Sequence, residues 1–212
     1  MHPFIDHLRQ KLQQSLPGSE AQFQMAPKPV DGGPQRKMEA PDDARSSSVL
    51  ILVYPNEESE LELLLTLRTS GIDHGGQISF PGGRSEQGET AADTALREAN
   101  EEVGIDPEQV EIVGRLTNLY VNHSNNQVTP VVGYLDRSPE LTLDPREVEE
   151  AFSVELDSLL HKKNLTVEDW ELGSHSFKVP YWDVHRVPLW GATAMMLNEF
   201  LEIYRGFRQG QE

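Results

Sequence analysis

Three glutamates, Glu98, Glu101 and Glu102, are spaced so that a helix would carry them on one face. Their like charges would repel one another and destabilise a bare helix by roughly a few tenths of a kcal/mol per pair. A divalent cation would reverse this effect, because Mg2+ prefers hard oxygen ligands and bridges to the phosphates of a substrate. The spacing therefore points to a metal site at which a water could be activated to attack phosphorus.

The same three residues have a simpler explanation, in which they form a solvated acidic helix face. The chain has 35 acidic residues against 18 Lys and Arg, so acidic helix faces are expected in it. The spacing of the glutamates alone favours this simpler explanation. The surrounding sequence has to decide between the two.

The helix that would carry the glutamates is specified at both ends. Thr90 and Asp93 form a capping box for a helix that begins at Ala91, and Gly104 stands where a left-handed residue would end it. The apolar residues on the arc opposite the glutamates are Ala92, Leu96, Ala99 and Val103. We therefore expect a helix over about 90–103, with one core face and one carboxylate face.

Counting outward from this helix gives a longer pattern. Gly83 lies six residues before Glu89, and Glu89 lies eight residues before Arg97. The segment Arg97-Glu98-Ala99-Asn100-Glu101-Glu102-Val103-Gly104-Ile105 completes the pattern. It resembles the Nudix box, G-x5-E-x7-R-E-U-x-E-E-x-G-U with U apolar, and matches it at every defined position.

The resemblance to the Nudix family implies a fold, a cofactor and a reaction. The implied fold is α/β, an α/β/α sandwich built on a mixed β-sheet. Mg2+ or Mn2+ would be held by box glutamates, with Glu98 and Glu102 as the first choices and Glu101 next. Water would attack a phosphorus of a diphosphate. Arg97 and Glu89 would orient the ligands, which is reasonable because Arg97 lies one turn before Glu101.

The residues before the box bear on the substrate. Residues 64–68 (Leu-Leu-Thr-Leu-Arg) and 76–83 resemble the signature of coenzyme A diphosphatases, L-L-T-x-R-[SA]-x3-R-x3-G-x3-F-P-G-G. Between them the match fails, because Thr69 replaces Ser or Ala and the segment is one residue shorter. The second arginine is also missing, since Ile72 or Asp73 stands at its position. Without that arginine, an ADP-ribose or another nucleoside-diphosphate-linked substrate is the alternative.

Three later segments resemble the same coenzyme A diphosphatase branch. Residues 128–134 are similar to its T-P-x-V-G strand, and residues 189–194 to its W-G-x-T-A helix. Residues 147–152 are similar to its E-V-x-x-x-F segment, although Glu155 replaces the proline that usually follows. The resemblance therefore implies hydrolysis of coenzyme A or its acyl derivatives to 4'-phosphopantetheine and 3',5'-ADP.

Five residues of the pre-box signature are candidates for substrate binding. Arg68 ends a strand beside the Gly-rich loop, although a surface salt bridge would also explain it. His74 either stabilises a turn or contacts the ligand. Gly82 and Gly83 would allow close backbone approach to a ligand, and Phe80 precedes them in the signature.

Glu147 is the candidate general base or additional metal ligand outside the box. It lies in an acidic segment with Glu149 and Glu150, and a solvent-facing acidic helix is the commoner origin of such a segment. We rank Glu147 first among the three.

Strands and helices that would position these residues follow from periodicity and turn signals. We expect a domain over 47–208, preceded at 1–46 by an amphipathic helix (3–16) and a flexible linker (18–46). The expected elements of the domain are strands at 48–54, 61–67, 109–117, 127–135 and 176–185, a Gly-rich turn region at 71–83, a segment with helical character at 146–160, and helices at 90–103 and 188–207. Irregular alternation of strands and helices also favours an α/β class.

Composition excludes several classes of function. The formal net charge is −17 with no basic patch, so we expect no nucleic-acid partner, and an RNA-cap hydrolase is disfavoured. No run approaches the roughly 18 apolar residues of a membrane span, and there is no signal segment, so we expect no membrane partner. Without cysteine a cytoplasmic location is the default. The expected partner is a small nucleotide-derived molecule, and the protein could form a homodimer. The alternative to an enzyme is a non-catalytic nucleotide-binding regulator.

Overall fold

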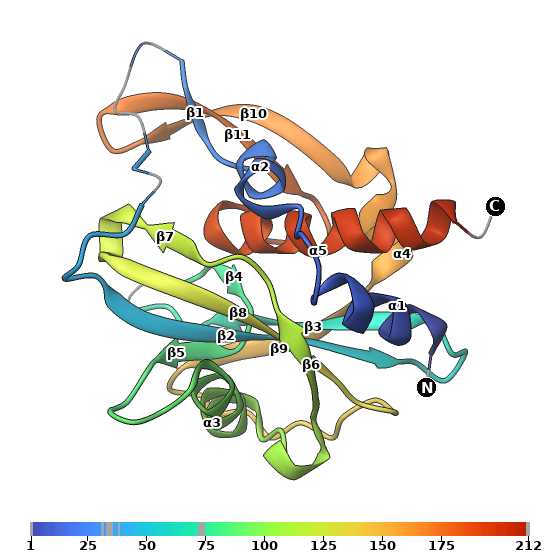
Figure 1. Cartoon of the computed structure of the whole chain (residues 1–212). Helices are drawn as coiled ribbons and strands as arrows, with labels where there is room; N and C mark the ends of the chain where they lie inside the picture. The colour runs from blue at the N-terminus through green and yellow to red at the C-terminus, as the bar shows by residue number, and fades with distance from the viewer. Residues whose placement is uncertain (1, 31, 33–35, 38, 72–74, 211–212) are drawn as a thin grey trace.

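A mixed β-sheet of eight strands forms the centre of the computed structural model, which describes residues 2–30, 32, 36–37, 39–71 and 75–210 (Figure 1). Its path is β4-β3-β2-β8-β6, with β5 added to β2, β7 to β8 and β9 to β3. β2 and β8 pair in parallel, and the other pairs are antiparallel. The strands are β2 (Arg45–Pro55), β3 (Leu61–Arg68), β4 (Ile78–Ser79), β5 (Gly82–Arg84), β6 (Glu111–Arg115), β7 (Leu119–Val121), β8 (Asn126–Tyr134) and β9 (Val148–Glu155).

Helices cover both faces of this sheet, which confirms the α/β class. In Figure 1, α3 lies alone below the sheet, while α5 and the shorter helices lie above it. The helices are α1 (Pro3–Lys11), α2 (Gly18–Gln24), α3 (Ala91–Val103), α4 (Leu156–Leu160) and α5 (Gly191–Gln209). A second sheet, in the order β1-β11-β10, stands beyond α5. Its strands are β1 (Lys28–Pro29), β10 (Leu165–Leu172) and β11 (His175–Trp182).

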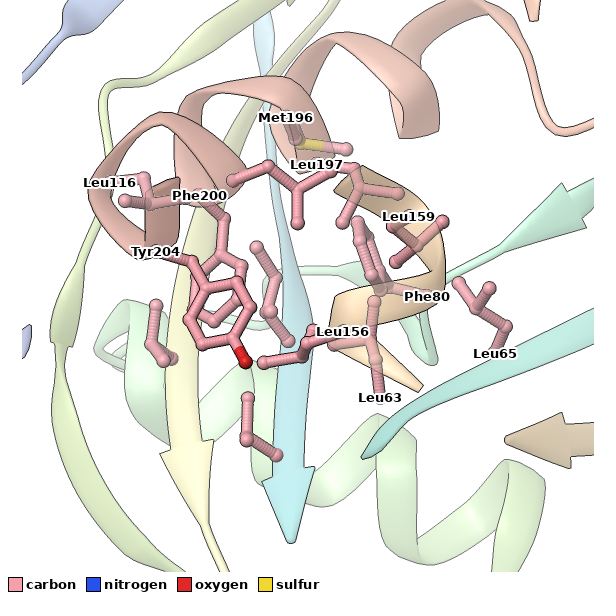
Figure 2. Packing of buried hydrophobic residues seen from close by; sticks show 14 of the residues in the cluster. Leu63, Leu65, Phe80, Leu116, Leu156, Leu159, Met196, Leu197, Phe200 and Tyr204 are labelled. Atoms are coloured by element: carbon pink, nitrogen blue, oxygen red, sulfur yellow. The ribbon is translucent and has the colours of Figure 1, made fainter. Parts of the chain in front are cut away.

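Two hydrophobic cores follow from the alternation of side chains along the central strand β2. Leu50 and Leu52 point to the α3 side and pack in a core with Ala95 and Ala99 of α3. Ile51 and Val53 point to the other side, toward the larger core under α5. Figure 2 shows part of this larger core, in which Phe200 and Tyr204 of α5 lie near Leu63 of β3 and Leu156 of α4. Each face of the sheet is therefore fixed by its own apolar packing.

The N-terminal segment differs from the expected helix and linker. α1 ends at Lys11 rather than near residue 16, and its Phe4, Ile5 and Leu8 lie in the larger core. The expectation of a linker from 18 to 46 is wrong for α2, which packs on α5. The sequence contains little indication of this helix, because α2 has few apolar residues. Its buried Gln22 is stabilised by hydrogen bonds instead.

Glu199 of α5 explains why α2 is ordered. This carboxylate is fully buried and accepts hydrogen bonds from the backbone N–H of Gly18 (3.1 Å) and from Gln22 Nε2 (2.8 Å). It also accepts from Thr117, through Oγ1 at 2.6 Å and through the backbone N–H. A buried charge satisfied in this way joins the N-terminal segment to α5 and to the loop before β7.

Two further expectations about the elements were wrong. The segment 146–160, expected to be helical, forms strand β9 along β3, and only Leu156–Leu160 is helical. Strand β10 was not expected at all, whereas β11 lies within the expected strand 176–185 apart from its first residue, His175. In the described part of the chain, every helix is too short or too polar to serve as a transmembrane span.

Candidate active site

Helix α3 is built as its sequence predicted. The side chain of Thr90 accepts from the backbone N–H of Asp93, while Asp93 accepts from the backbone N–H of Thr90, which completes the capping box. Gly104 ends the helix with φ 75°. The small buried residues Ala95 and Ala99 let the helix approach β2 closely, so the helix is held against the sheet.

Glu102 is the most buried of the three glutamates, with 2% of its surface exposed. Its Oε1 lies 3.3 Å from Arg68 Nη1, and its Oε2 accepts from the backbone N–H of Gly82 at 3.2 Å. Burial raises the pKa of Glu102 to about 7, although Arg68 and the Gly82 amide act in the opposite direction. The simpler explanation, a solvated acidic helix face, is therefore wrong for Glu102, because β5 and the end of β3 cover it.

Glu98 lies one turn before Glu102 and beside the backbone of β5. A Cβ added to Gly83 would lie 2.4 Å from the Glu98 carboxylate, so a larger residue would require this side chain to leave its position beside β5. Burial is the main cause that raises the pKa of Glu98, and the charges of Glu101 and Glu147 add to it. Gly82 is needed for a different reason, since its Cβ would lie 2.4 Å from the backbone oxygen of Ser48.

Arg97 connects three of the box carboxylates. Its Nε lies 2.7 Å from Glu89 Oε1 and its Nη2 lies 3.1 Å from Glu89 Oε2, which is a bidentate pair. Its Nη1 lies 2.8 Å from Glu98 and 3.2 Å from Glu101, and its Nη2 donates to the backbone oxygen of Arg84. Hydrogen bonds from Arg97, above all, lower the pKa of Glu89 to about 2. Arg97 is thus held by Glu89 in contact with Glu98.

Glu101 differs from its two neighbours. Its side chain is 58% exposed, and Arg97 is its ion-pair partner. The structure therefore places Glu98 and Glu102 beside β5 and leaves Glu101 toward solvent.

Glu147 is an exposed residue whose charge acts on the box glutamates. It raises the pKa of both Glu98 and Glu102, which places its carboxylate on their side of the molecule. Its loop is tied to α3, because the backbone N–H of Asp144 donates to the backbone oxygen of Glu102 at 2.9 Å. A second hydrogen bond, from the backbone N–H of Thr69 to the backbone oxygen of Glu147 (2.9 Å), ties the same loop to the end of β3. The sequence indicated helical character at Glu147, but this residue directly precedes strand β9 and lies on no helix.

A cleft of 1240 Å3 opens beside these residues, on the α5 side of the sheet. Arg68, Gly82 and Gly83 line it, so three predicted substrate-binding residues lie where the cleft meets the glutamates. Its lining also includes the apolar side chains of Leu172 and Trp190 and residues of the first turn of α5. Among the described residues, no Asp or Glu lines the cleft. In a chain with 35 acidic residues, this composition favours an anionic ligand with an apolar part.

The other two predicted substrate residues have different outcomes. Phe80 borders the cleft, but its side chain is 1% exposed and packs in the larger core near Leu63 and Leu159 (Figure 2). Its side chain therefore supports the cleft wall and presents almost no free surface to a ligand. His74 lies outside the described residues.

Arg45 and Arg84 also line the cleft, although no sequence motif pointed to them. Arg84 directly follows Gly82-Gly83, a position that could have suggested it. Arg45 is brought beside it only by the pairing of β2 with β5. The sequence offers no local signal for that pairing.

Glu98 and Glu102 have the donor chemistry that a divalent cation needs. Among the described residues, no three acidic or histidine side chains already form a metal-binding group. Glu98 and Glu102 nevertheless fit, because two neighbouring carboxylates whose pKa values are raised by burial and by like charge gain from a cation between them. Mg2+ needs only one or two carboxylates, with waters and phosphate oxygens as its other ligands. Glu147 is a third oxygen donor on the same side.

Comparison with known proteins gives a single family. The NUDIX domain family model matches residues 44–175. Nudix hydrolase 3 of Caenorhabditis elegans is 31% identical over 180 residues, which is 76% of this chain and 74% of that protein. Nudix hydrolase 15, mitochondrial, of Arabidopsis thaliana is 31% identical over 84% of this chain and 64% of its own length. The peroxisomal coenzyme A diphosphatase of Mus musculus is 39% identical over 126 residues, 56% of this chain.

The chain spans about half to three quarters of the length of these relatives, with 53% for the mouse protein. Among solved structures, a Nudix hydrolase from M. smegmatis superposes with a TM-score of 0.53 at 17% identity, over 85% of this chain and 94% of that one. A MutT/nudix family protein from Enterococcus faecalis gives a TM-score of 0.50 at 16% identity, over 97% of this chain and 75% of that one. These structures agree in fold.

Proposed function

This chain belongs to the Nudix family, and we propose that it hydrolyses the diphosphate linkage of coenzyme A or of its acyl derivatives. The observation that carries this proposal is the junction at Arg68, Glu102 and Gly82, where a buried box carboxylate meets a cleft whose described lining includes arginines and no acidic residue. The lining of the cleft also includes Leu172 and Trp190. A substrate with a charged nucleotide and a less polar arm matches both kinds of lining.

Glu98 and Glu102 would hold Mg2+ or Mn2+, with Glu147 as a further donor. When bound, the cation supplies charge neutralisation at the phosphate oxygens and lowers the pKa of the attacking water. Arg97 keeps Glu98 in place, because its own position is fixed by the bidentate pair with Glu89. Arg68 partly compensates the buried charge of Glu102 and lies at the edge of the cleft, where a phosphate would come into reach.

Glu147 is our candidate general base. It is exposed, so water reaches it, and its charge acts on both inner glutamates. In the reaction the water oxygen bonds to one phosphorus while the bridging oxygen leaves with the other, and Glu147 takes the proton of the water. The products are 4'-phosphopantetheine and 3',5'-ADP.

Support for coenzyme A comes from the motifs before and after the box and from the likeness to the mouse enzyme, which is named for this substrate. The alternative is a nucleoside-diphosphate-linked compound such as ADP-ribose, which the missing second arginine favours. A non-catalytic nucleotide-binding role is a third possibility, and the complete set of box glutamates argues against it. Two of the relatives carry mitochondrial and peroxisomal names, so the cytoplasmic location stays a prediction. The homodimer also stays a prediction.

A panel of coenzyme A, acetyl-coenzyme A and ADP-ribose, assayed with Mg2+ at equal concentrations, tests the proposal. We expect the two coenzyme A compounds to be hydrolysed with a kcat/KM at least about tenfold above that of ADP-ribose, a difference that a few extra contacts would produce. Faster turnover of ADP-ribose would instead support the alternative. Absence of turnover for all three, together with nucleotide binding, would favour a regulator.

A further inference from the structure

Two arginines line the cleft with guanidinium groups that pair with no side chain in the described part of the chain. The guanidinium groups of Arg45 and Arg84 make no hydrogen bond or ion pair with any described residue, and both residues are exposed. In a chain of net charge −17, an unpaired arginine beside another is not explained by the folded structure. Arg68, in contrast, is paired with Glu102.

Strand pairing brings Arg45 and Arg84 together. Arg84 of β5 lies opposite Ser47 of β2, and Arg45 is two residues away along β2. Residues opposite each other, and those two apart on one strand, share a face of the sheet. Arg45 and Arg84 are therefore diagonal neighbours on the cleft side, at a separation of about 7–8 Å that long side chains easily bridge.

The position of this pair separates it from the glutamates. Gly82, which donates to Glu102, lies opposite Val49, and four residues separate Val49 from Arg45. At about 3.3 Å per residue, Arg45 is roughly 13 Å along the strand from the level of Gly82. Arg84 is nearer, because it directly follows Gly83, which lies against Glu98. The pair therefore extends away from the glutamates along the cleft, where it could bind a group of the substrate beyond a diphosphate held at Glu98 and Glu102.

We propose that Arg45 and Arg84 form a subsite for a phosphate monoester that the substrate carries in addition to its diphosphate. Two guanidinium groups provide planar, bidentate donors suited to a dianionic phosphate, and no acidic residue of the described cleft competes for them. The subsite would take over the role of the arginine that is absent before the box. The proposal rests on the proposed function, because coenzyme A differs from dephospho-coenzyme A by such a phosphate.

The test compares coenzyme A with dephospho-coenzyme A in the wild type and in Arg45→Ala, Arg84→Ala and the double variant. Arg115→Ala is the matched control, because Arg115 is also exposed on the same sheet, without a described partner, but lies outside the cleft. We expect the wild type to favour coenzyme A at least about tenfold in kcat/KM and each variant to lose about tenfold on coenzyme A alone. The control should keep the preference.

Equal losses on both compounds would overturn the proposal, since the arginines would then bind the diphosphate. A wild type without preference, or variants without effect, would overturn it too. A calorimetric comparison of 3',5'-ADP with AMP binding separates this outcome from failure of the proposed function. If the wild type hydrolyses neither coenzyme A compound yet binds 3',5'-ADP more tightly than AMP through the two arginines, the subsite stands and the reaction is wrong.

Discussion

Arg68 Nη1 lies 3.3 Å from Oε1 of Glu102, a carboxylate with 2% of its surface exposed. This ion pair joins the end of β3 to α3, two elements on different layers of the fold. Because Arg68 also lines the cleft, it places the most buried box carboxylate directly behind the substrate region. The burial that makes Glu102 costly to ionise is the same feature that makes it a strong candidate for a cation ligand.

The three box glutamates should differ in their contribution to catalysis. Glu98→Gln and Glu102→Gln each remove a charge beside β5, and we expect kcat to fall by at least about 100-fold, since these side chains would hold the cation. Glu101→Gln removes a carboxylate that is 58% exposed and contacts Arg97, so its loss should stay under about tenfold. Steady-state kinetics with saturating Mg2+ measures the order, and a larger loss for Glu101→Gln would contradict the ligand assignment.

Stability of the metal-free protein should depend on pH through Glu102. Its pKa is raised from the usual 4.5 to about 7, so between these values the folded state binds more protons than the unfolded state. The free energy of unfolding should therefore fall as the pH rises from about 4.5 to 7. Urea unfolding at several pH values checks this, and Glu102→Gln should flatten the slope. A wild-type slope that the substitution leaves unchanged would contradict the assignment to Glu102.

Glu89 should act in the opposite direction and in another pH range. Because its pKa is lowered to about 2, its contribution is present above about 4.5 and is lost as the pH falls toward 2. The two effects therefore do not overlap. The free energy of unfolding of Glu89→Gln should therefore be lower than that of the wild type at pH 7, and this difference should disappear near pH 2.

Gly83→Ala should damage activity without unfolding the protein. The new Cβ would lie 2.4 Å from the Glu98 carboxylate, so that side chain must move. We expect kcat to fall by about tenfold or more, because a displacement of this size misplaces a catalytic group. Gly206→Ala on α5 is the control, since nothing lies within 4 Å of its Cβ, and it should leave activity intact. Wild-type kcat in Gly83→Ala would show that Glu98 need not lie beside β5.

Glu199→Ala should destabilise the fold by about 3 kcal/mol, since it leaves the buried donors of Gly18, Gln22 and Thr117 without an acceptor. Glu202→Ala, on the same helix but one third exposed and paired with Arg205, should cost less than about 1 kcal/mol. Chemical denaturation measures both. Equal effects would mean that the Glu199 network contributes little.

The sequence predicted those parts of the site that are determined locally. The capping box at Thr90, the end at Gly104 and the spacing of the glutamates all lie within α3 or next to it. The burial of Glu102 was not predictable, because it depends on Arg68 and β5 folding over the helix. Arg45 and Arg84 were missed for the same reason, since strand pairing alone makes them neighbours.

The errors in the fold also come from contacts distant in sequence. The segment that forms β9 has mixed periodicity, and it becomes a strand because β3 offers an edge for pairing. α2 is short and polar, and its order depends on Glu199, which is 177 residues from Gln22 in sequence. Local helix and strand propensities do not indicate that β3 or Glu199 will be the partner of these segments.

The central claim is tested most directly by mass spectrometry of the products that the protein forms from coenzyme A in the presence of Mg2+. We predict equal amounts of 3',5'-ADP and 4'-phosphopantetheine from the wild type, and at least about 100-fold slower formation of both products by Glu102→Gln. Intact coenzyme A after prolonged incubation with the wild type, or cleavage at any bond other than the diphosphate, would contradict the account.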